Sequence, residues 1–442
     1  MLQPRQRLLV VTRHCPFPEN DGAGAYLFDL LSHLKHGGAV IDLLWLQPDR
    51  ALYRRGVFIS SRRFHAVARL HLPGAINFGR WRFFPSVWWL PFKARSLHFV
   101  KTLLCMFPAF RQRFARRAAT RPASPSPATF AWSALPSRAE TQAFRALAAR
   151  IAPDAVLINY CWLMPLAAEV PYARRMVLTH DVASHRLRLT GAARSDLPRK
   201  RNPAHPEGEA ALLADADAIL AISDEDAAVF RGMHPTKAVL TVPKAAPLPA
   251  ASSPASTVAG RCLFVGGRNA PNEEGLRWFL DRVWPRVRAA WPEASLHVCG
   301  GVCEVFQEPC EGVVFRGRVE NLAQDYAAAE AVVVPLLRGT GMKIKLVEAA
   351  SHGKACVTTP VGLQGLKFFE PAVLCASAPE AFANAMVRVL ASADLRAQLG
   401  RDLQAAAARH LSPEACYNSV KRWLQIDAAP ATAPAAATLP AT

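Results

Sequence analysis

The sequence lacks several features that would place it in a membrane or outside the cell. It contains no run of 18 apolar residues free of charge, the length that a transmembrane helix needs. Its first ten residues hold one short apolar run and no cleavage site, so we expect no signal peptide. Its ten cysteines are irregularly spaced, and the closest three lack the paired C-x2-C spacing of a zinc site (Cys299, Cys303 and Cys310). We therefore expect a reduced, cytoplasmic protein without a metal.

Acidic residues are also scarce. The chain has 34 Asp and Glu against 53 Lys and Arg, which leaves a net charge of +19 and favours an anionic partner. Between Asp49 and Glu140 there is no acidic residue, whereas Arg and Lys occur 17 times, interleaved with Trp and Phe. This mixture is typical of a surface that binds anionic lipid. It also suits nucleic acid, which we do not expect because no nucleic-acid module is recognisable, and a purely structural role stays open.

The 442 residues are 51% apolar and 20% charged, which predicts two globular domains. Short apolar runs with strand propensity alternate with turn-rich and helix-length segments, and this order predicts parallel sheets. The runs are 7–12, 40–46, 155–158, 175–179 and 218–222, then 261–265, 295–298, 313–315, 331–335 and 355–358. Segments 119–137 and 245–260 are rich in Ala, Pro and Ser, and the second is the expected domain boundary.

The densest group of candidate functional residues lies in residues 335–366, PLLRGTGMKIKLVEAASHGKACVTTPVGLQGL. A strand is expected to end at Pro335, and a helix is expected to begin near Lys343. The small residues of the loop between them let backbone amides approach a ligand, and a helix N-terminus favours a phosphate. Arg338, Lys343 and Lys345 are expected to add fixed positive charge, and Glu348 is expected to accept the hydroxyls of a ribose.

With these residues the chain resembles the glycosyltransferases of the GT-B fold, specifically glycosyltransferase family 4, in its Gly-Thr-Gly-Met-Lys-x-Lys subgroup. The resemblance implies an α/β protein with two doubly wound Rossmann-like domains that face a central cleft. It assigns residues 1–250 to an acceptor-side domain, with the basic aromatic segment of about 50–139 inserted in it. Residues 258–411 form the domain that binds the nucleotide sugar, and 412–427 form a C-terminal helix. The composition of 428–442 predicts a disordered tail.

The resemblance also assigns roles to individual residues. His180 and Asp181, expected just after a strand, are the catalytic candidates, although Asp181 could equally cap the next helix. Glu348 matches the second Glu of the family motif, whereas the first Glu is replaced by Thr340, so loop amides are expected to contact the donor sugar instead. The donor-binding candidates are Gly22, Gly24, Gly267, Arg268, Gly339, Thr340, Gly341, Lys343, Lys345 and Glu348.

The implied reaction transfers a sugar from a nucleoside diphosphate sugar to a hydroxyl of a glycan or lipid-linked acceptor, with retention at the anomeric carbon. No cofactor is expected, because cationic side chains and helix-terminal amides would stabilise the diphosphate leaving group in place of a metal. The basic aromatic segment would hold the enzyme on the inner face of the membrane. Two alternatives stay open, a non-catalytic protein of this fold that binds a nucleotide or polyanion, and a nucleotide-sugar epimerase.

Overall fold

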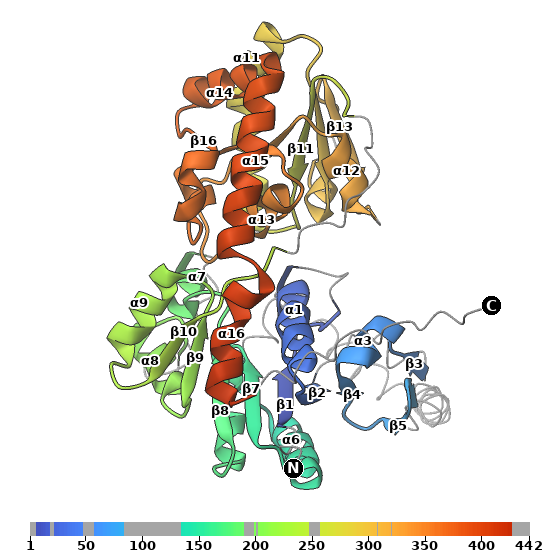
Figure 1. Cartoon of the computed structure of the whole chain (residues 1–442), viewed down its shortest axis with the longest axis vertical. Coiled ribbons are helices and arrows are strands. Elements are labelled where there is room, and N and C mark those ends of the chain that lie inside the picture. Colours follow the sequence, from blue (N-terminus) through green and yellow to red (C-terminus); the bar gives the residue numbers. More distant parts are fainter. Residues whose placement is uncertain are drawn as a thin grey trace, which may run out of the picture.

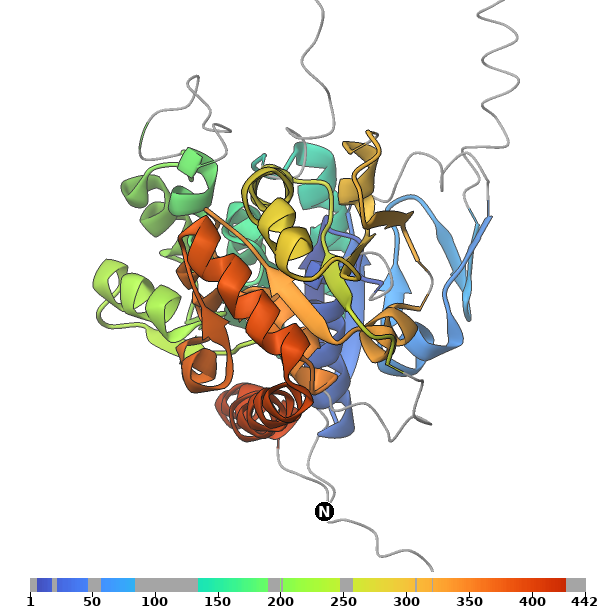
Figure 2. The same cartoon turned by 90° about the horizontal axis from the view of Figure 1, so that it is seen from above.

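A computed structural model of the chain describes residues 6–17, 22–46, 57–83, 134–189, 199, 202–246, 257–306, 308–319 and 321–426. Two domains follow one another along the chain, and each is built around a parallel sheet (Figure 1). Helices cover the sheets of both domains, as the view from above also shows (Figure 2).

The N-terminal domain contains a seven-stranded sheet in which every pair of neighbours is parallel. The strand order is β10-β9-β8-β7-β1-β2-β4. The strands are β1 (Arg7–Thr12), β2 (Val40–Trp45), β4 (Arg69–His71), β7 (Ala155–Asn159), β8 (Arg174–Leu178), β9 (Ala218–Ala221) and β10 (Ala238–Thr241). The helices are α1 (Gly22–His36), α3 (Arg62–Val67), α6 (Arg138–Ile151), the 3-10 helix η1 (Cys161–Glu169), α7 (Ala183–Leu189), α8 (Pro206–Leu213) and α9 (Asp224–Met233).

The C-terminal domain contains a six-stranded parallel sheet with the order β13-β12-β11-β14-β15-β16. Its strands are β11 (Arg261–Val265), β12 (Ser295–Cys299), β13 (Val313–Gly317), β14 (Ala331–Val334), β15 (Ala355–Thr358) and β16 (Leu374–Cys375). Its helices are α10 (Ala270–Trp278), the π-helix η3 (Phe279–Val283), α11 (Trp284–Ala290), α12 (Leu322–Ala328), α13 (Ile344–Ser351), α14 (Pro379–Ala391) and α15 (Ala393–His410), with the short 3-10 helices η4 (Gly301–Glu304), η5 (Pro360–Leu363) and η6 (Lys367–Ala372).

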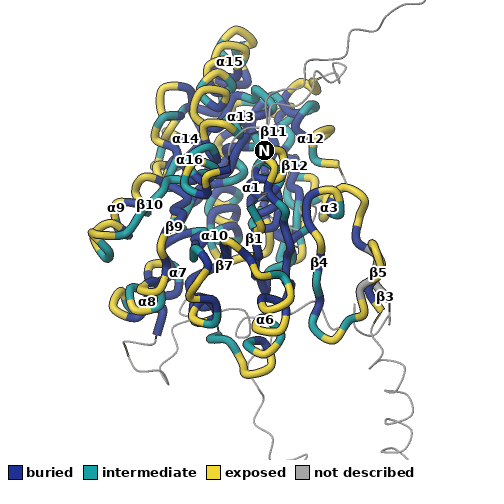
Figure 3. The backbone as a smooth tube through the Cα atoms, turned by 60° about the horizontal axis from the view of Figure 1, so that its bottom comes forward, coloured by how far each residue is buried: buried dark blue, intermediate teal, exposed yellow. Residues whose placement is uncertain are grey.

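The central strands are continuous apolar runs because helices cover both faces of each sheet. All five residues of β7 and all four residues of β14 are buried. The strands therefore run through the interior, whereas the outer helices alternate between buried and exposed residues (Figure 3). This arrangement confirms the prediction of two doubly wound α/β domains.

The last helix, α16 (Pro413–Leu424), leaves the C-terminal domain and packs against the N-terminal one (Figure 1). The Tyr417 hydroxyl accepts a hydrogen bond from the backbone amide of Ala245 at 2.9 Å. Arg174 at the start of β8 donates to the carbonyl of Trp423 at 2.6 Å. The C-terminal helix therefore fastens the two domains together.

The structure differs from the sequence prediction in the basic aromatic segment. Strand β4 belongs to the main sheet, so residues 50–139 are not wholly an insertion. A separate antiparallel sheet, with the order β3-β6-β5, accounts for much of the rest of residues 57–83. Its strands are β3 (Val57–Ile59), β5 (Ile76–Phe78) and β6 (Trp81–Phe83). Residues 84–133, the expected linker 247–256 and the tail 428–442 lie outside the described residues.

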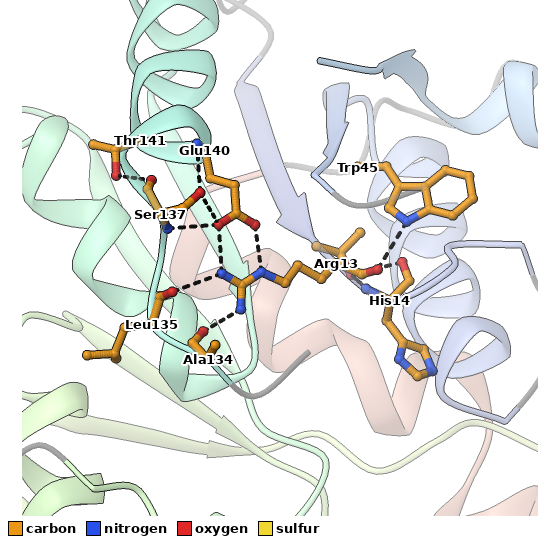
Figure 4. Close-up of polar contacts among 9 residues, drawn as sticks. Arg13, His14, Trp45, Ala134, Leu135, Ser137, Glu140 and Thr141 are labelled. Atoms are coloured by element: carbon orange, nitrogen blue, oxygen red, sulfur yellow. Dashed lines mark hydrogen bonds and ion pairs between the residues drawn. The ribbon is translucent and has the colours of Figure 1, made fainter. Parts of the chain in front are cut away.

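Where the described chain resumes at residue 134, a buried ion pair fixes it to the end of β1 (Figure 4). The Arg13 guanidinium donates to both carboxylate oxygens of Glu140, at 2.7 and 2.8 Å. Glu140 also belongs to a capping box with Ser137 at the start of α6. Burial alone would raise the pKa of Glu140, but the hydrogen bonds from Arg13 and Ser137 outweigh it and hold that pKa below its usual range.

We expect Glu140→Gln to lower the free energy of unfolding by about 3 kcal/mol, because it leaves the buried Arg13 charge without its partner. Glu169→Gln is the matched control, since its partner Arg145 is 63% exposed, and it should cost less than about 1 kcal/mol. Because the pKa of Glu140 is depressed, its contribution is complete above the usual carboxyl range and is lost as the pH falls through the folded-state pKa. Urea unfolding of both variants at neutral and acidic pH checks this, and equal losses for the two variants would contradict it.

Candidate functional site

Loops that follow the strands of the two sheets meet at the boundary between the domains. α1 follows β1 in the N-terminal domain, and α13 follows β14 in the C-terminal domain. Their first turns approach so closely that a Cβ atom on Gly22 would lie 3.3 Å from Cγ1 of Ile344. The carboxyl edges of parallel sheets are where ligands bind in this class of fold, and the structure therefore places a candidate site between the domains.

The loop between β14 and α13 makes the tightest contact with the N-terminal domain. Gly341 has a φ of +64°, and a Cβ atom there would lie 2.7 Å from the carbonyl oxygen of His180. Only glycine fits this conformation and this approach. Next to it, the hydroxyl of Thr340 donates to Oδ2 of Asp181 at 2.8 Å. Two donor-loop candidates and both catalytic candidates are thus brought together.

Lys343 precedes α13 and is 7% exposed. Its ammonium group donates to the carbonyl oxygens of Thr340 and Gly341, at 3.1 and 2.7 Å. It also donates to Oε1 of Gln364 at 3.2 Å. Burial lowers the pKa of Lys343 to about 8, against the opposing effect of the Asp181 carboxylate.

Lys345, one residue into α13, is tied to the loop that follows β11. Its Nζ donates to Oδ1 of Asn272 at 2.7 Å, and Nδ2 of Asn272 donates to the carbonyl of Gly267 at 2.8 Å. The ammonium group also lies 4.3 Å from the centre of the Phe264 ring. Burial lowers the pKa of Lys345 to about 7. Burial therefore makes the charge of Lys343 and Lys345 depend on pH in a range where the charge of an exposed lysine does not change.

Glu348 lies one turn further along α13 and accepts a hydrogen bond from the Tyr326 hydroxyl at 2.9 Å. Burial raises the pKa of this carboxyl, although Tyr326 and two lysines act in the opposite direction. Lys345 and Glu348 thus form a partly buried pair. The pKa of each group depends on the charge of the other and on the charge of a ligand bound beside them.

His180 is held in one tautomer by a chain of hydrogen bonds. The Thr12 hydroxyl donates to the carbonyl of His14 at 3.1 Å, so it accepts from Nδ2 of Asn159 at 2.9 Å. This orientation turns Oδ1 of Asn159 toward Nε2 of His180, 2.8 Å away, so Nε2 carries the proton. The imidazole also stacks on Tyr160, with ring centres 4.2 Å apart.

Asp181 does not cap the helix that follows it. The first amides of α7, those of Ala183 and Ser184, both donate to the buried carboxylate of Glu209 at 2.8 Å. Asp181 faces Thr340 instead, with Nε of Arg186 3.4 Å from the same oxygen. Its second oxygen, Oδ1, is buried without a hydrogen-bond partner among the described residues, which marks it as a group with unused acceptor capacity.

Three other donor-binding candidates, two glycines and an arginine, lie in surroundings other than those expected from the sequence. Gly22 and Gly24 occupy the first turn of α1 rather than a loop. The Arg268 side chain is 63% exposed and pairs with Glu304 at 3.2 Å. Gly339, by contrast, lies beside Lys343, since a Cβ atom there would be 3.4 Å from its Nζ.

A cavity of about 450 Å³ extends from this loop along the domain boundary. Thr340, Gly341 and Gly365 line it from the C-terminal domain, and Val182 and Asp226 line it from the N-terminal domain. Burial, with help from the neighbouring Asp181 charge, raises the pKa of Asp226 to about 7. The cavity is therefore large enough for a small ligand and lined by hydrogen-bonding groups of both domains.

Sequence patterns did not indicate the residues that hold or neighbour the candidates, namely Asn159, Tyr160, Glu209, Asp226 and the side-chain amide of Asn272. Asn159 and Tyr160 could have been found, since Asn159 ends the buried strand β7 and Tyr160 follows it, close to where His180 follows β8. Tyr160 also has a φ of +77°, an uncommon backbone conformation for a residue with a side chain and one that is found at functional sites. Glu209 and Asp226 gave no local signal, because their partners lie on other elements.

Among the described residues, no three His, Cys, Asp or Glu side chains gather so that they could hold a metal ion. Within the same ranges, no helix is long and apolar enough to cross a membrane. The nine described cysteines are all free thiols.

Comparison with known proteins bears on the C-terminal domain and on the whole fold. Residues 259–392 match the family model described as "Glycosyl transferases group 1". A segment of 115 residues is 28% identical to an uncharacterized 44.6 kDa protein from the cps region of Klebsiella pneumoniae. This match covers 23% of the present chain and 30% of that relative, so it spans less than a third of the relative's length.

Solved structures resemble nearly the whole chain. Sucrose-phosphate synthase from Thermosynechococcus elongatus has a TM-score of 0.64 at 18% identity, with 95% of this chain and 98% of that one covered. Anabaena HepE in complex with UDP-glucose has a TM-score of 0.61 at 13% identity, with 95% and 100% covered. The fold is therefore that of the GT-B glycosyltransferases, two Rossmann-like domains in tandem.

The contact between Gly341 and His180 can be tested by substitution. Gly341→Ala adds a methyl group against the His180 carbonyl, so we expect residues 180–189 and 339–345 to separate and their amides to exchange faster with deuterium. Gly74→Ala is the matched control, because Gly74 has a similar φ of +71° with no atom within 4 Å of a Cβ. In both variants, backbone strain should lower the free energy of unfolding by about 1–2 kcal/mol. Unchanged exchange at the domain boundary in Gly341→Ala would refute the contact.

Proposed function

We propose that the chain is a glycosyltransferase that moves a sugar from a nucleoside diphosphate sugar to a hydroxyl of a glycan or lipid-linked acceptor. The observation that carries the proposal is the N-terminus of α13, where Lys343, Lys345 and Glu348 gather opposite His180 and Asp181 of the other domain. The match of residues 259–392 to the group 1 glycosyl transferases supports the same conclusion.

The donor diphosphate lies at the start of α13 in this proposal. The helix N-terminus and the two lysines favour an anion there. Both lysines are held at lowered pKa by burial, so an arriving diphosphate restores their full charge. Glu348, positioned by Tyr326, accepts hydrogen bonds from the ribose hydroxyls. Arg268 lies on the loop after β11 and reaches the diphosphate only by leaving Glu304.

In the transfer step, the bond between the anomeric carbon and the β-phosphate oxygen breaks, and its electron pair leaves with the diphosphate. The acceptor oxygen forms the new bond on the same face, which gives retention, and its proton passes to the departing phosphate. The lysines stabilise the charge that grows on the leaving group, as a metal ion does in other transferases. His180 donates through Nε2 to Asn159, and this bond fixes its ring at the sugar.

The nucleotide is best tested first as a uridine nucleotide. HepE was solved with UDP and with UDP-glucose, and it shares the fold of this chain at 13% identity. The cavity between Thr340 and Asp226 is assigned to the transferred sugar and the acceptor, because it begins at the donor loop and is lined by both domains. Its hydrogen-bonding groups suit the hydroxyls of a hexose.

Isothermal titration with UDP, GDP and ADP, without metal, tests the donor site. We expect one nucleotide to bind, and Lys345→Ala and Glu348→Ala each to weaken it at least about tenfold, since each removes a charged hydrogen-bonding group. Lys35→Ala is the matched control, because Lys35 is exposed at the far end of α1. Binding without transfer from the matching nucleotide sugar would favour the non-catalytic alternative. Absence of binding by every nucleotide would rule out the donor site.

The lowered lysine pKa values predict how donor affinity depends on pH. Lys345 in the free protein has a pKa of about 7, and the bound diphosphate favours its protonated form. Affinity for UDP-glucose, whose phosphates do not titrate in this range, should therefore be constant below pH 7 and fall as the pH rises above it. In Lys345→Arg the guanidinium stays charged, so the decline should begin near pH 8, where Lys343 titrates. Titrations from pH 6 to 9 check this, and identical profiles for the two proteins would contradict it.

A further inference from the structure

The small sheet β3-β6-β5 stands at the flank of the N-terminal domain, where Figures 1 and 2 both place it. In its register Ile76 lies opposite Phe83, and Phe78 lies opposite Trp81. Since side chains alternate along a strand, these four residues share one face. They are 61%, 37%, 75% and 44% exposed, in the order just given. Strands β5 and β6 thus present four apolar side chains to their surroundings at this flank (Figure 3).

On the opposite face of the same sheet, the side chain of Arg82 is buried. Arg82 lies between Trp81 and Phe83 and is only 2% exposed. Its Nε donates to the carbonyl of Leu70 in β4 at 2.7 Å, and its Nη1 donates to the carbonyls of Gly79 and Trp81 at 2.7 and 2.8 Å. The bond to Leu70 fastens the small sheet to the main sheet, whereas the bonds to Gly79 and Trp81 lie within the β5–β6 hairpin.

An exposed apolar face of this kind is unusual in the molecule. Nine large apolar side chains are exposed in the described part of the chain, and four of them are on this one face. Trp81 and Phe83 stack with ring centres 6.2 Å apart and planes 9° apart, so they form a flat surface. Isolated exposed apolar residues need no explanation, but a contiguous group marks an interaction site.

The surrounding charge identifies the partner. Arg62, Arg63 and Arg69 are exposed on the neighbouring elements α3 and β4. The segment between Asp49 and Glu140 contributes no acidic residue to this flank. In the described part of the chain, acidic residues of other elements reach only Arg69, which lines a cavity with Asp42 and Asp154, and Arg63, which lines one with Asp29 and Glu414. We propose that the face formed by Ile76, Phe78, Trp81 and Phe83 (the apolar face) docks on an anionic lipid bilayer. The rings enter the headgroup region, and the arginines meet anionic lipid.

Other partners fit the same surface less well. A stable protein–protein interface needs about 20–30 residues on each side, far more than this small sheet offers. Single-stranded nucleic acid stacks its bases on aromatic rings, and Ile76 at 61% exposure offers no ring. A bilayer requires only shallow insertion of a few apolar side chains beside positive charge. If the proposed function holds, such docking brings the cleft to lipid-linked acceptors.

Vesicle flotation of the full chain tests the proposal. We expect the protein to float with vesicles of phosphatidylglycerol and phosphatidylcholine and to bind pure phosphatidylcholine much more weakly. The double variant Phe78→Ser/Trp81→Ser should lose at least about tenfold in partitioning, and what remains should disappear at high salt, because only the electrostatic part is left. Tyr172→Ser is the matched control, since Tyr172 is 64% exposed on a different part of the same domain, and it should float like the wild type.

Circular dichroism melting of each variant shows whether it still folds, so that loss of docking is not confused with unfolding. Neither flotation nor melting uses a nucleotide, so both results are independent of the proposed glycosyltransferase function. The proposal is overturned if the wild type does not float, or if the double variant floats as well as the wild type. It is also overturned if a single-stranded oligonucleotide displaces the protein from vesicles in the wild type and no longer binds the double variant, since the apolar face would then be a nucleic-acid site.

Discussion

The close approach of Gly341 to the His180 carbonyl, across the boundary between the two domains, is the constraint on which the candidate site depends. The two residues belong to loops that follow strands of different sheets, β14 and β8. Their contact fixes how near α13 can come to the N-terminal domain, and so it sets the position of both lysines relative to His180. A side chain at 341 would widen the cleft by roughly the size of a methyl group, and transfer reactions lose much of their rate when groups shift by about 1 Å. The hydrogen bond from Thr340 to Asp181 also links the two loops across the domain boundary.

The polar groups of the site are arranged for a ligand that brings negative charge. Lys343 and Lys345 are surrounded by neutral acceptors, the carbonyls of their own loop and the amides of Gln364 and Asn272. Neutral acceptors accept the hydrogen bonds of an ammonium group and leave its charge in place. A carboxylate in direct contact would accept the same hydrogen bonds and also cancel the charge. Burial therefore lowers the pKa of both lysines, and the nearby carboxylates of Asp181, Asp226 and Glu348 offset this effect only in part. A site arranged in this way binds an anion more strongly than surface lysines, because the positive charge has not been neutralised in advance.

The sequence predicted the main sheets well and the orienting residues poorly, for a physical reason. Strands such as β1 and β11 are continuous apolar runs bounded by turns, so local composition is enough to find them to the residue. The cluster at Thr340, Lys343 and Glu348 was found because its members lie in one strand–loop–helix unit. The part played by Asn159, Glu209 and Asp226 depends on long-range pairing, in which an amide or carboxylate meets a group on another element. Similarly, the lowered pKa of Lys345 comes from burial, which no spacing of residues encodes. The antiparallel sheet was missed because its three-residue strands are too short to show alternation.

The acid-poor segment shows how a missing residue type shapes a surface. A buried arginine is ordinarily satisfied by a carboxylate, but Arg82 lies in a stretch that has none. Its hydrogen-bond partners among the described residues are all backbone carbonyls. Arg13, which faces the end of the same stretch, pairs with Glu140, the first acidic residue after it. Neither Arg82 nor Arg13 pairs with a carboxylate from within the segment, because the segment has none. Its exposed arginines therefore have no acidic partner in the segment itself. The exposed arginines of the segment and its apolar face thus lie on neighbouring elements of one flank, namely α3, β4 and the small sheet.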